Sequence, residues 1–276
     1  MKNLRHIMLP IIGIILISFG SFFLFLQSQV RNVDLASLKN NKQILSIQIT
    51  QLSENIAALA GDSMWWDDAY TKIHISYDAE WVDNSIGDSV KTLENIDAAF
   101  LYGVKNNILY SYVSDGGPTA EVLLISGLEE YLKTLKVTDF VTPIIFSGIV
   151  QSQERLFLIG ASVVQRSRAV EVTKIPPERR PILIYVHEIN QNRLDVFGDD
   201  FELEGLRLNF EGELKEEFLP IDNNLSQLYF TDNNNLSIEW VPKRPGTDLV
   251  ENIFYPLILI TLLVASALIY FFINVS

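Results

Sequence analysis

The sequence predicts an α+β fold in which a long N-terminal helix packs on an antiparallel sheet, with a membrane-spanning helix on either side of the domain. Two long stretches carry no charged residue, an apolar stripe at helical spacing follows the first stretch, and short β-rich runs fill much of the remainder. Of the 276 residues, 48% are hydrophobic and 20% are charged. This is too apolar for an ordinary soluble domain unless the excess is concentrated in a few segments.

The first apolar stretch, residues 7–27, predicts a membrane-spanning helix because it has the roughly 20 residues that cross a bilayer. A cleaved signal peptide is the alternative. The apolar core of a signal peptide spans only about 7–15 residues, however, and Leu26-Gln27-Ser28-Gln29 makes a poor cleavage site. Because Lys2 and Arg5 precede the stretch, the positive-inside rule places residues 1–6 in the cytoplasm.

The second apolar stretch, residues 253–273, predicts a return span of similar length. Residues 28–252 then lie outside the cytoplasm as one domain, and residues 274–276 form a cytoplasmic stub. Because this stub is too short to carry an output, the chain looks like a fragment or a natural truncation.

The exterior part is strongly acidic. Apart from Lys2 and Arg5, the chain has 19 basic and 34 acidic residues, so this part carries a formal charge of −15. Nucleic acid and anionic lipid are therefore disfavoured as partners. The absence of cysteine excludes disulfides and thiolate metal sites, and about 225 residues are enough to build a core without them.

An apolar stripe predicts a long helix after the first span. Its positions alternate three and four residues apart, with Lys42 interrupting one place. The stripe consists of Leu35, Leu38, Leu45, Ile49, Leu52, Ile56 and Leu59. It can pair with the same helix of a second subunit, as in a homodimer, or pack on the domain's own sheet, and the spacing is compatible with both. Continuing the register places Trp66 and Tyr70 on the buried face of the helix.

Beyond Ser76 the pattern becomes β-rich. Residues 81–93 predict short helical stretches, and Ala98–Val113 predicts a hairpin that turns at Lys105-Asn106-Asn107. The further elements expected are a helix at 128–135, strands at 142–150 and 155–164, a basic loop at 166–180, a strand at 181–189, and shorter strands at 206–210, 228–231 and 236–241. Together these elements predict a single α+β domain.

Two motifs resemble those of one known family. Asp62–Tyr70 (DSMWWDDAY) is similar to the D-x-x-x-W-D-D-x-Y entry motif of type-four CHASE domains, and Ile238–Gly246 (IEWVPKRPG) is similar to the W-x-P-x-R-P-G segment before the second membrane helix of these receptors. Weaker similarity occurs at Asn84, Ala99–Tyr102 and Phe201–Leu208. Together the matches cover most of residues 30–250, and the specificity lies in the combination of the two motifs.

The resemblance implies an extracytoplasmic ligand sensor in the inner membrane of a bacterium, with a PAS/Cache-like sheet. In such receptors the sensor feeds a cytoplasmic GGDEF cyclase, which makes cyclic-di-GMP, an EAL phosphodiesterase or a histidine kinase, and the usual pairing of these outputs implies a homodimer. This chain departs from that pattern because it contains no output module. The alternative function is a membrane-tethered scaffold whose exterior domain binds another protein.

The tryptophan motif supplies most candidate ligand-binding residues. They are Trp65, Trp66, Asp67, Asp68 and Tyr70, together with Tyr102 from the predicted hairpin. At helical spacing Asp62, Trp66 and Tyr70 share one face, whereas Asp67 and Asp68 point away from it. Aromatic surfaces can hold an apolar or cationic ligand while a carboxylate fixes an ammonium or hydroxyl group. Alternatively, Trp66 and Tyr70 are core anchors and the aspartates bind nearby backbone amides.

Other chemistry is disfavoured. His6, His74 and His187 lack the paired spacing of a metal site, and no cofactor or nucleophile motif occurs. A hydrolase that uses Asp67 and Asp68 ranks last, because adjacent residues on a helix diverge by roughly 100°. The basic loop around Arg179 and Arg180 can receive an anionic ligand or lipid headgroup, but charges in a proline-containing loop are more often solvated. We therefore expect neither an enzyme nor a metal or cofactor.

Overall fold

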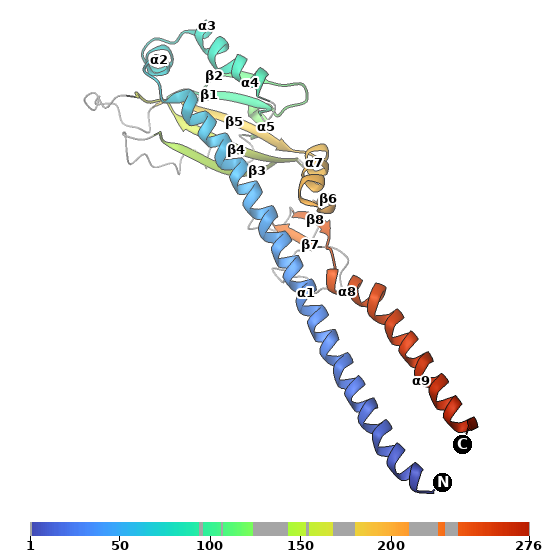
Figure 1. Ribbon diagram of the computed structural model, residues 1–276. Helices are drawn as coiled ribbons and strands as arrows, with labels where there is room; N and C mark the ends of the chain where they lie inside the picture. The colour runs from blue at the N-terminus through green and yellow to red at the C-terminus, as the bar shows by residue number, and fades with distance from the viewer. Residues whose placement is uncertain are drawn as a thin grey trace.

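The computed structural model describes residues 2–93, 96–105, 107–123, 143–152, 155–167, 180–209, 226–229 and 237–275. Figure 1 shows one long helix, a sheet packed on its C-terminal half, a smaller sheet nearer the chain ends, and a last helix that runs beside the start of the first. Both termini lie at the end of the molecule opposite the larger sheet. The predicted α+β class with a long N-terminal helix is confirmed.

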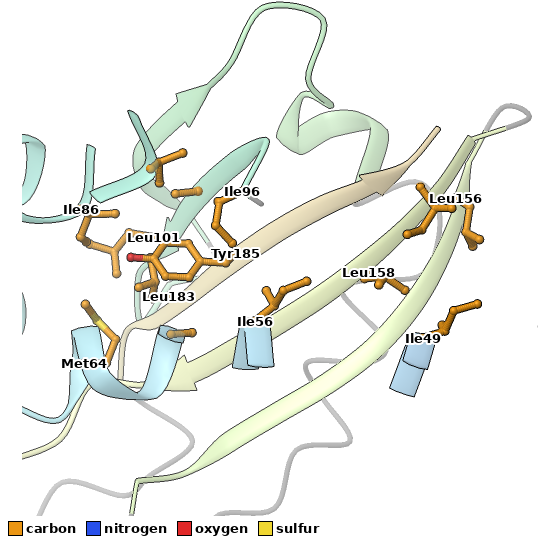
Figure 2. Packing of buried hydrophobic residues seen from close by; sticks show 14 of the residues in the cluster. Ile49, Ile56, Met64, Ile86, Ile96, Leu101, Leu156, Leu158, Leu183 and Tyr185 are labelled. Atoms are coloured by element: carbon orange, nitrogen blue, oxygen red, sulfur yellow. The ribbon is translucent and has the colours of Figure 1, made fainter. Parts of the chain in front are cut away.

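The first helix, α1 (Lys2–Met64), is 63 residues long, which corresponds to about 95 Å at the usual helical rise. Four residues of the predicted stripe are buried, namely Leu38, Leu45, Ile49 and Ile56. Figure 2 shows Ile49 and Ile56 packed beside the strands of the larger sheet. The spacing of the stripe was compatible with a second subunit or with the domain's own sheet. In the structure, the sheet covers the C-terminal half of α1.

Five strands form the larger sheet. In chain order they are β1 (Ala98–Tyr102), β2 (Ile108–Val113), β3 (Ile145–Ser152), β4 (Arg155–Val163) and β5 (Ile182–Ile189). Their spatial order is β2-β1-β5-β4-β3, and every neighbouring pair is antiparallel. Both predicted hairpins and the strand predicted at 181–189 are confirmed.

The three central strands of the larger sheet, β1, β5 and β4, are buried on both faces, and the side chains along each strand point alternately to the two faces. On β1, Ala99 and Leu101 point into the core that α1 shares, and Figure 2 shows Leu101 beside Tyr185 there. Phe100 and Tyr102 point into a second core on the opposite face. A residue's place along a strand therefore decides which core it joins.

Gly160 on β4 allows α1 to cross the sheet closely. A Cβ atom at Gly160 would lie 2.2 Å from the backbone nitrogen of Ala57. Since real Cβ atoms do not approach backbone this closely, only glycine fits at this crossing. This contact fixes α1 against the middle of β4.

Three shorter strands form a separate sheet closer to the chain ends. They are β6 (Glu204–Asn209), β7 (Ser226–Tyr229) and β8 (Ser237–Val241), in the order β6-β8-β7. All three were expected as strands, but they do not extend the larger sheet. The fully buried Trp240 on β8 joins the same core as α1, which places one motif tryptophan in the core.

A helix that the sequence analysis did not predict, α7 (Gln191–Phe201), connects the two sheets. Its residue Arg193 donates hydrogen bonds to both carboxylate oxygens of Asp97, just before β1, at 2.5 and 3.0 Å. Asp97 also accepts the backbone N–H of Glu188 on β5 at 2.7 Å. This ion pair fixes α7 to the larger sheet.

Short helices follow α1 on the side of the sheet that α1 covers. They are α2 (Asp67–Ala69), the π-helical η1 (Tyr70–Ile75), α3 (Ala79–Val82), η2 (Asp83–Gly87) and α4 (Asp88–Thr92). The helical stretches predicted at 81–93 are thereby confirmed. One more turn, α5 (Ala120–Leu123), lies after β2. The helix predicted at 128–135 and most of the basic loop lie outside the described residues.

The chain ends in three consecutive helical segments, α8 (Pro245–Leu249), η5 (Val250–Phe254) and α9 (Tyr255–Val275). Within the described residues, one stretch, Pro245–Ala267, has the length and composition to cross a membrane, and its most apolar part is not buried. The first span expected at residues 7–27 lies inside α1, but many of its side chains fall outside the described part. The two-span topology therefore stays a prediction.

Candidate functional site

The tryptophan motif interrupts the long helix instead of continuing it. α1 ends at Met64, and Trp66 has an extended backbone (φ −132°, ψ 146°) before α2 begins. The carbonyl oxygen of Met64 accepts the backbone N–H of Gln165, just past β4, at 3.1 Å. This bond satisfies a carbonyl at the end of the helix, so the sheet helps to determine where α1 stops.

The expected burial of Trp66 is wrong, because the break turns this residue away from the helix face that packs on the sheet. Trp66 is 59% exposed, whereas Tyr70 is 1% exposed. Asp62 is exposed as well, so Asp62, Trp66 and Tyr70 do not share one wall of a pocket. Trp65 is half-buried, and its indole Nε1 has no hydrogen-bond partner among the described residues.

Asp67 and Asp68 are exposed in the first turn after the break. Carboxylates are favoured there because they lie at the positive end of the helical segment. The backbone carbonyl of Asp67 accepts the Thr71 hydroxyl at 2.8 Å. The pKa of Lys72 is raised mainly by its hydrogen bond to Asp78, with a smaller attraction from Asp68. These contacts of the two aspartates are local to the helical segment.

The buried ring of Tyr70 is surrounded by nitrogen-bearing side chains. The guanidinium carbons of Arg166 and Arg180 lie 4.8 and 5.8 Å from the ring centroid. The ring centroid of His74 lies 5.1 Å away, with the two rings tilted by 53°. Guanidinium groups within about 6 Å of an aromatic face are attracted by its negative quadrupole. We call Tyr70, His74, Arg166 and Arg180 the Tyr70 cluster.

Two backbone hydrogen bonds bring the two arginines to the end of α1. The N–H of Gln165 bonds to Met64, and the N–H of Val164 donates to the carbonyl of Pro181 at 2.9 Å. The first bond fixes the residues just past β4 against the end of α1, and the second fixes those residues against the start of β5. Arg166 and Arg180 are thus adjacent to Tyr70, although they are far from it in the sequence.

Burial changes the electrostatics of the Tyr70 cluster. Arg180 is 8% exposed, and desolvation lowers its pKa, an effect that Tyr70 opposes. The pKa of His74 is also lowered, first by burial and second by the charge of Arg180. The cluster therefore concentrates positive charge in a place where water screens it poorly.

Tyr102 is not part of this cluster. Its side chain belongs to the second core, on the face of the sheet opposite to the core that contains Tyr70. β1 alternates strictly, so Leu101 and Tyr102 point to opposite faces. The six predicted ligand-binding residues therefore do not come together in one place. Tyr70 and Tyr102 lie on opposite faces of the sheet, and others of the six are exposed to solvent.

A second feature of functional interest lies at the other end of the domain. The buried carboxylate of Asp34, on α1, accepts the backbone N–H of Gly246 at 2.7 Å and the hydroxyl of Thr247 at 2.6 Å. The backbone N–H of Thr247 donates to the same carboxylate at 3.2 Å. These N–H groups are at the start of α8, where a helix has donors without partners of its own. We call this contact the Asp34 clamp.

The clamp explains the proline and glycine of the second motif. Pro245 occupies the first turn of α8, where a missing N–H costs nothing. A Cβ atom at Gly246 would lie 2.6 Å from the carbonyl oxygen of Val30. Gly246 is therefore the residue that lets α8 approach α1 closely enough for Asp34 to bond to it.

The sequence analysis missed both features in part. It noted Arg180 only as one charge in a basic loop and did not connect Arg166 or His74 with Tyr70. It did not single out Asp34, although a lone acidic residue beside the first position of an apolar stripe was a usable signal. No described group of acidic or histidine side chains could hold a metal ion.

Comparison with known families identifies the matched region. The family model for the CHASE4 domain matches residues 49–209, which is more than half of the chain and includes the tryptophan motif, the larger sheet and α7. No curated protein matches the chain.

Proposed function

This chain belongs to the CHASE4 domain family, a family of sensor domains, and on that premise we propose that it senses a small molecule outside the cytoplasm and relays binding through two membrane-spanning helices. The relay would end in an output such as a cyclic-di-GMP cyclase, an EAL phosphodiesterase or a histidine kinase. CHASE4 is a sensor family rather than a catalytic one, and no catalytic domain is evident in this chain.

The observation that carries the proposal is the Asp34 clamp, because it joins the helix that enters the domain to the helix that leaves it. The Met64 end of α1 contacts the Tyr70 cluster through Gln165, and Asp34 lies about 45 Å before it at the usual helical rise. A long helix packed on the sheet is stiff enough to carry a small displacement over this distance. The clamp then transfers the displacement to α8 and α9.

Beyond the clamp the two helices separate. A cleft of ≈ 370 Å³ lies between α1 and the segments η5 and α9, with Leu26, Val30 and Phe254 among its walls. The helices are thus joined where α8 begins and spaced apart beyond it, which suits a relay that changes their relative position. A ligand can shift that position only by its difference in affinity between the two arrangements.

The membrane topology is part of the proposal. Residues 7–27 and 253–273 would span the inner membrane of a bacterium, with 28–252 on the periplasmic or exterior side. The exposed apolar surface of Pro245–Ala267 supports the second span. The larger sheet, antiparallel and covered by a long N-terminal helix, is consistent with the PAS/Cache-like type expected for the sensor.

A homodimer also stays a proposal. The apolar stripe from Leu45 onward is covered by the larger sheet, so it does not supply the dimer contact. Val33 and Ile47 are large apolar residues of α1 that remain 47% and 44% exposed. They offer a different face of α1 to a second subunit.

A screen for ligands tests the sensing proposal. The full chain, purified in detergent, is heated with a panel of amino acids, amines, sugars and organic acids, and unfolding is followed by tryptophan fluorescence. A sensor is expected to be stabilised by one class of compound. If a correctly folded chain responds to none of them, small-molecule sensing is contradicted and the protein-binding scaffold is favoured.

A further inference from the structure

We propose that the Tyr70 cluster binds the carboxylate or phosphate group of a small organic anion. This inference rests on the proposed sensing function and gives the ligand its chemical class. It differs from the expectation that aromatic surfaces hold an apolar or cationic ligand while a carboxylate fixes an ammonium or hydroxyl group, because the fold brings two guanidinium groups to Tyr70.

The first step is the convergence of two guanidinium groups and an imidazole ring from three separate segments on one aromatic ring. Arg166 comes from just past β4, Arg180 from just before β5, and His74 from η1. The chain has 34 acidic and 21 basic residues, so composition does not favour two arginines beside one tyrosine ring. Because both guanidinium groups lie against the Tyr70 ring, an anion bound beside this ring would be attracted by both.

The second step is a comparison with the other cations of the domain. Ion pairs join most described cations of the sheets, short helices and their loops to carboxylates: Lys72 to Asp78, Lys91 to Asp88, Arg155 to Glu188, Arg193 to Asp97, Arg207 to Glu239 and Lys243 to Glu202. Within the described residues, Arg166 makes no ion pair and instead lies over the Tyr70 ring. Its fork of N–H donors is available to two oxygen atoms of a ligand.

The third step is burial. A guanidinium that is 8% exposed, as in Arg180, sits in a medium that screens charge weakly, so an anion gains more there than it would at the surface. The ring of Tyr70 forms an apolar wall beside the charges. This combination of a charged end and an aromatic wall suits a small acid with a carbon skeleton.

The last step connects the anion to the relay. Arg166 follows Gln165 directly, and the N–H of Gln165 bonds to the last carbonyl of α1. A ligand that draws Arg166 toward it therefore acts on the backbone that ends α1. The anion site and the start of the proposed relay are one residue apart.

The test compares matched pairs of probes that differ in charge. Succinate and succinamide, benzoate and benzamide, and glutamate and glutamine form these pairs. They are titrated into the full chain in detergent, with citrate and inorganic phosphate as further anions, and binding is measured by calorimetry. At least one anion is expected to bind at least tenfold more tightly than its neutral counterpart. Arg166→Gln should weaken that binding at least tenfold, and Arg166→Lys should restore part of it.

Lys39→Gln serves as the control, because it removes one positive charge from an exposed position on α1, far from Tyr70. This variant should bind the anion as the unmodified chain does. Arg166 is only half-buried, so Arg166→Gln is expected to fold, and its thermal unfolding without probe checks this.

Two results would overturn the inference. If a neutral or cationic compound binds and Arg166→Gln leaves its affinity unchanged, the anion assignment fails while the sensing function stands. If a folded chain binds no anion of the panel and no compound of the wider screen, both proposals fail together. Equal binding of an anion by Arg166→Gln and the unmodified chain would likewise move the site away from the Tyr70 cluster.

Discussion

The carboxylate of Asp34 accepts a hydrogen bond from the backbone N–H of Gly246 at 2.7 Å, across 212 residues of sequence. This bond places the start of the C-terminal helix against the helix that begins the chain. A second donor, Thr247, bonds to the same carboxylate through both its hydroxyl and its N–H. The two helices of the proposed relay are thus joined by hydrogen bonds to a buried side chain and not only by packing.

Removing the clamp should destabilise the chain. Asp34→Ala leaves the N–H groups at the start of α8 without their acceptor inside a buried contact, and we expect a loss of about 1–3 kcal/mol in the free energy of unfolding. Glu54→Ala, which removes an exposed acidic residue of the same helix, is the matched control and should change stability little. Thermal and denaturant unfolding of the full chain measure both, and equal effects of the two substitutions would show that the clamp does not form.

Adding one methyl group at Gly246 should separate the helices. The new Cβ would meet the Val30 carbonyl oxygen at 2.6 Å, so Gly246→Ala is expected to cost about 1–3 kcal/mol, as overpacking does. Gly20→Ala, on α1, is the control because its Cβ would have no neighbour within 4 Å. The melting temperature of Gly246→Ala should therefore be lower than that of Gly20→Ala. If Gly246→Ala melts at the same temperature as the unmodified chain, the close approach of α8 to α1 is contradicted.

The two aromatic residues of the tryptophan motif should respond differently to truncation. Tyr70→Ala removes a ring that is 1% exposed, for which a loss of about 3–5 kcal/mol is typical of large aromatic side chains. Trp66→Ala removes a side chain that is 59% exposed and should cost far less. Denaturant midpoints of both variants decide the question. A larger effect at Trp66 would restore the expectation that this residue is the buried one.

The stability of the chain should depend on His74 in mildly acidic solution. Burial, and then the charge of Arg180, lower the pKa of His74 in the folded chain below its usual 6.5. Between these two pKa values the unfolded chain binds more protons, so the free energy of unfolding falls as the pH drops through 6.5 toward the folded pKa. Above 6.5 the contribution is fully present.

His74→Gln should flatten this part of the pH profile. The measurement is thermal unfolding of both chains from neutral pH down to about pH 5, a range in which unperturbed histidines titrate. His187 is a second buried histidine, and its Nδ1 atom lies 3.8 Å from a carboxylate oxygen of Asp97. The variant His187→Gln therefore separates the contribution of His187 from that of His74. An unchanged slope in His74→Gln would show that His74 does not contribute to the dependence.

The elements that could be predicted from sequence are those that local patterns determine. The two hairpins were predictable because apolar runs flank short polar turns, as at Lys105-Asn106-Asn107 and around residues 151–154. The helix α1 was predictable because its stripe repeats over many turns. In each case the signal lies within a few residues of the element that it predicts.

The candidate site could be predicted only in part because long-range contacts decide it. The end of α1 depends on a hydrogen bond from Gln165, which no pattern around Met64 reveals. The prediction from sequence continued the register of the apolar stripe past Met64. It therefore placed Trp66 on the buried face of the helix, whereas the side chain is exposed. The arginines of the cluster come to Tyr70 only because β4 ends and β5 begins at the same edge of the sheet.

The most direct test of the relay measures the distance between the two helices beyond the clamp. The chain has no cysteine, so Leu24→Cys and Leu259→Cys give two unique attachment sites for spin labels, both on exposed side chains. A compound that stabilises the chain should shift the distance distribution measured by pulsed electron paramagnetic resonance in lipid nanodiscs. The same labelled chain with Asp34→Ala should bind the compound but lose most of the shift. An unchanged distance on binding, or an equal shift with Asp34→Ala, would contradict the relay through the Asp34 clamp.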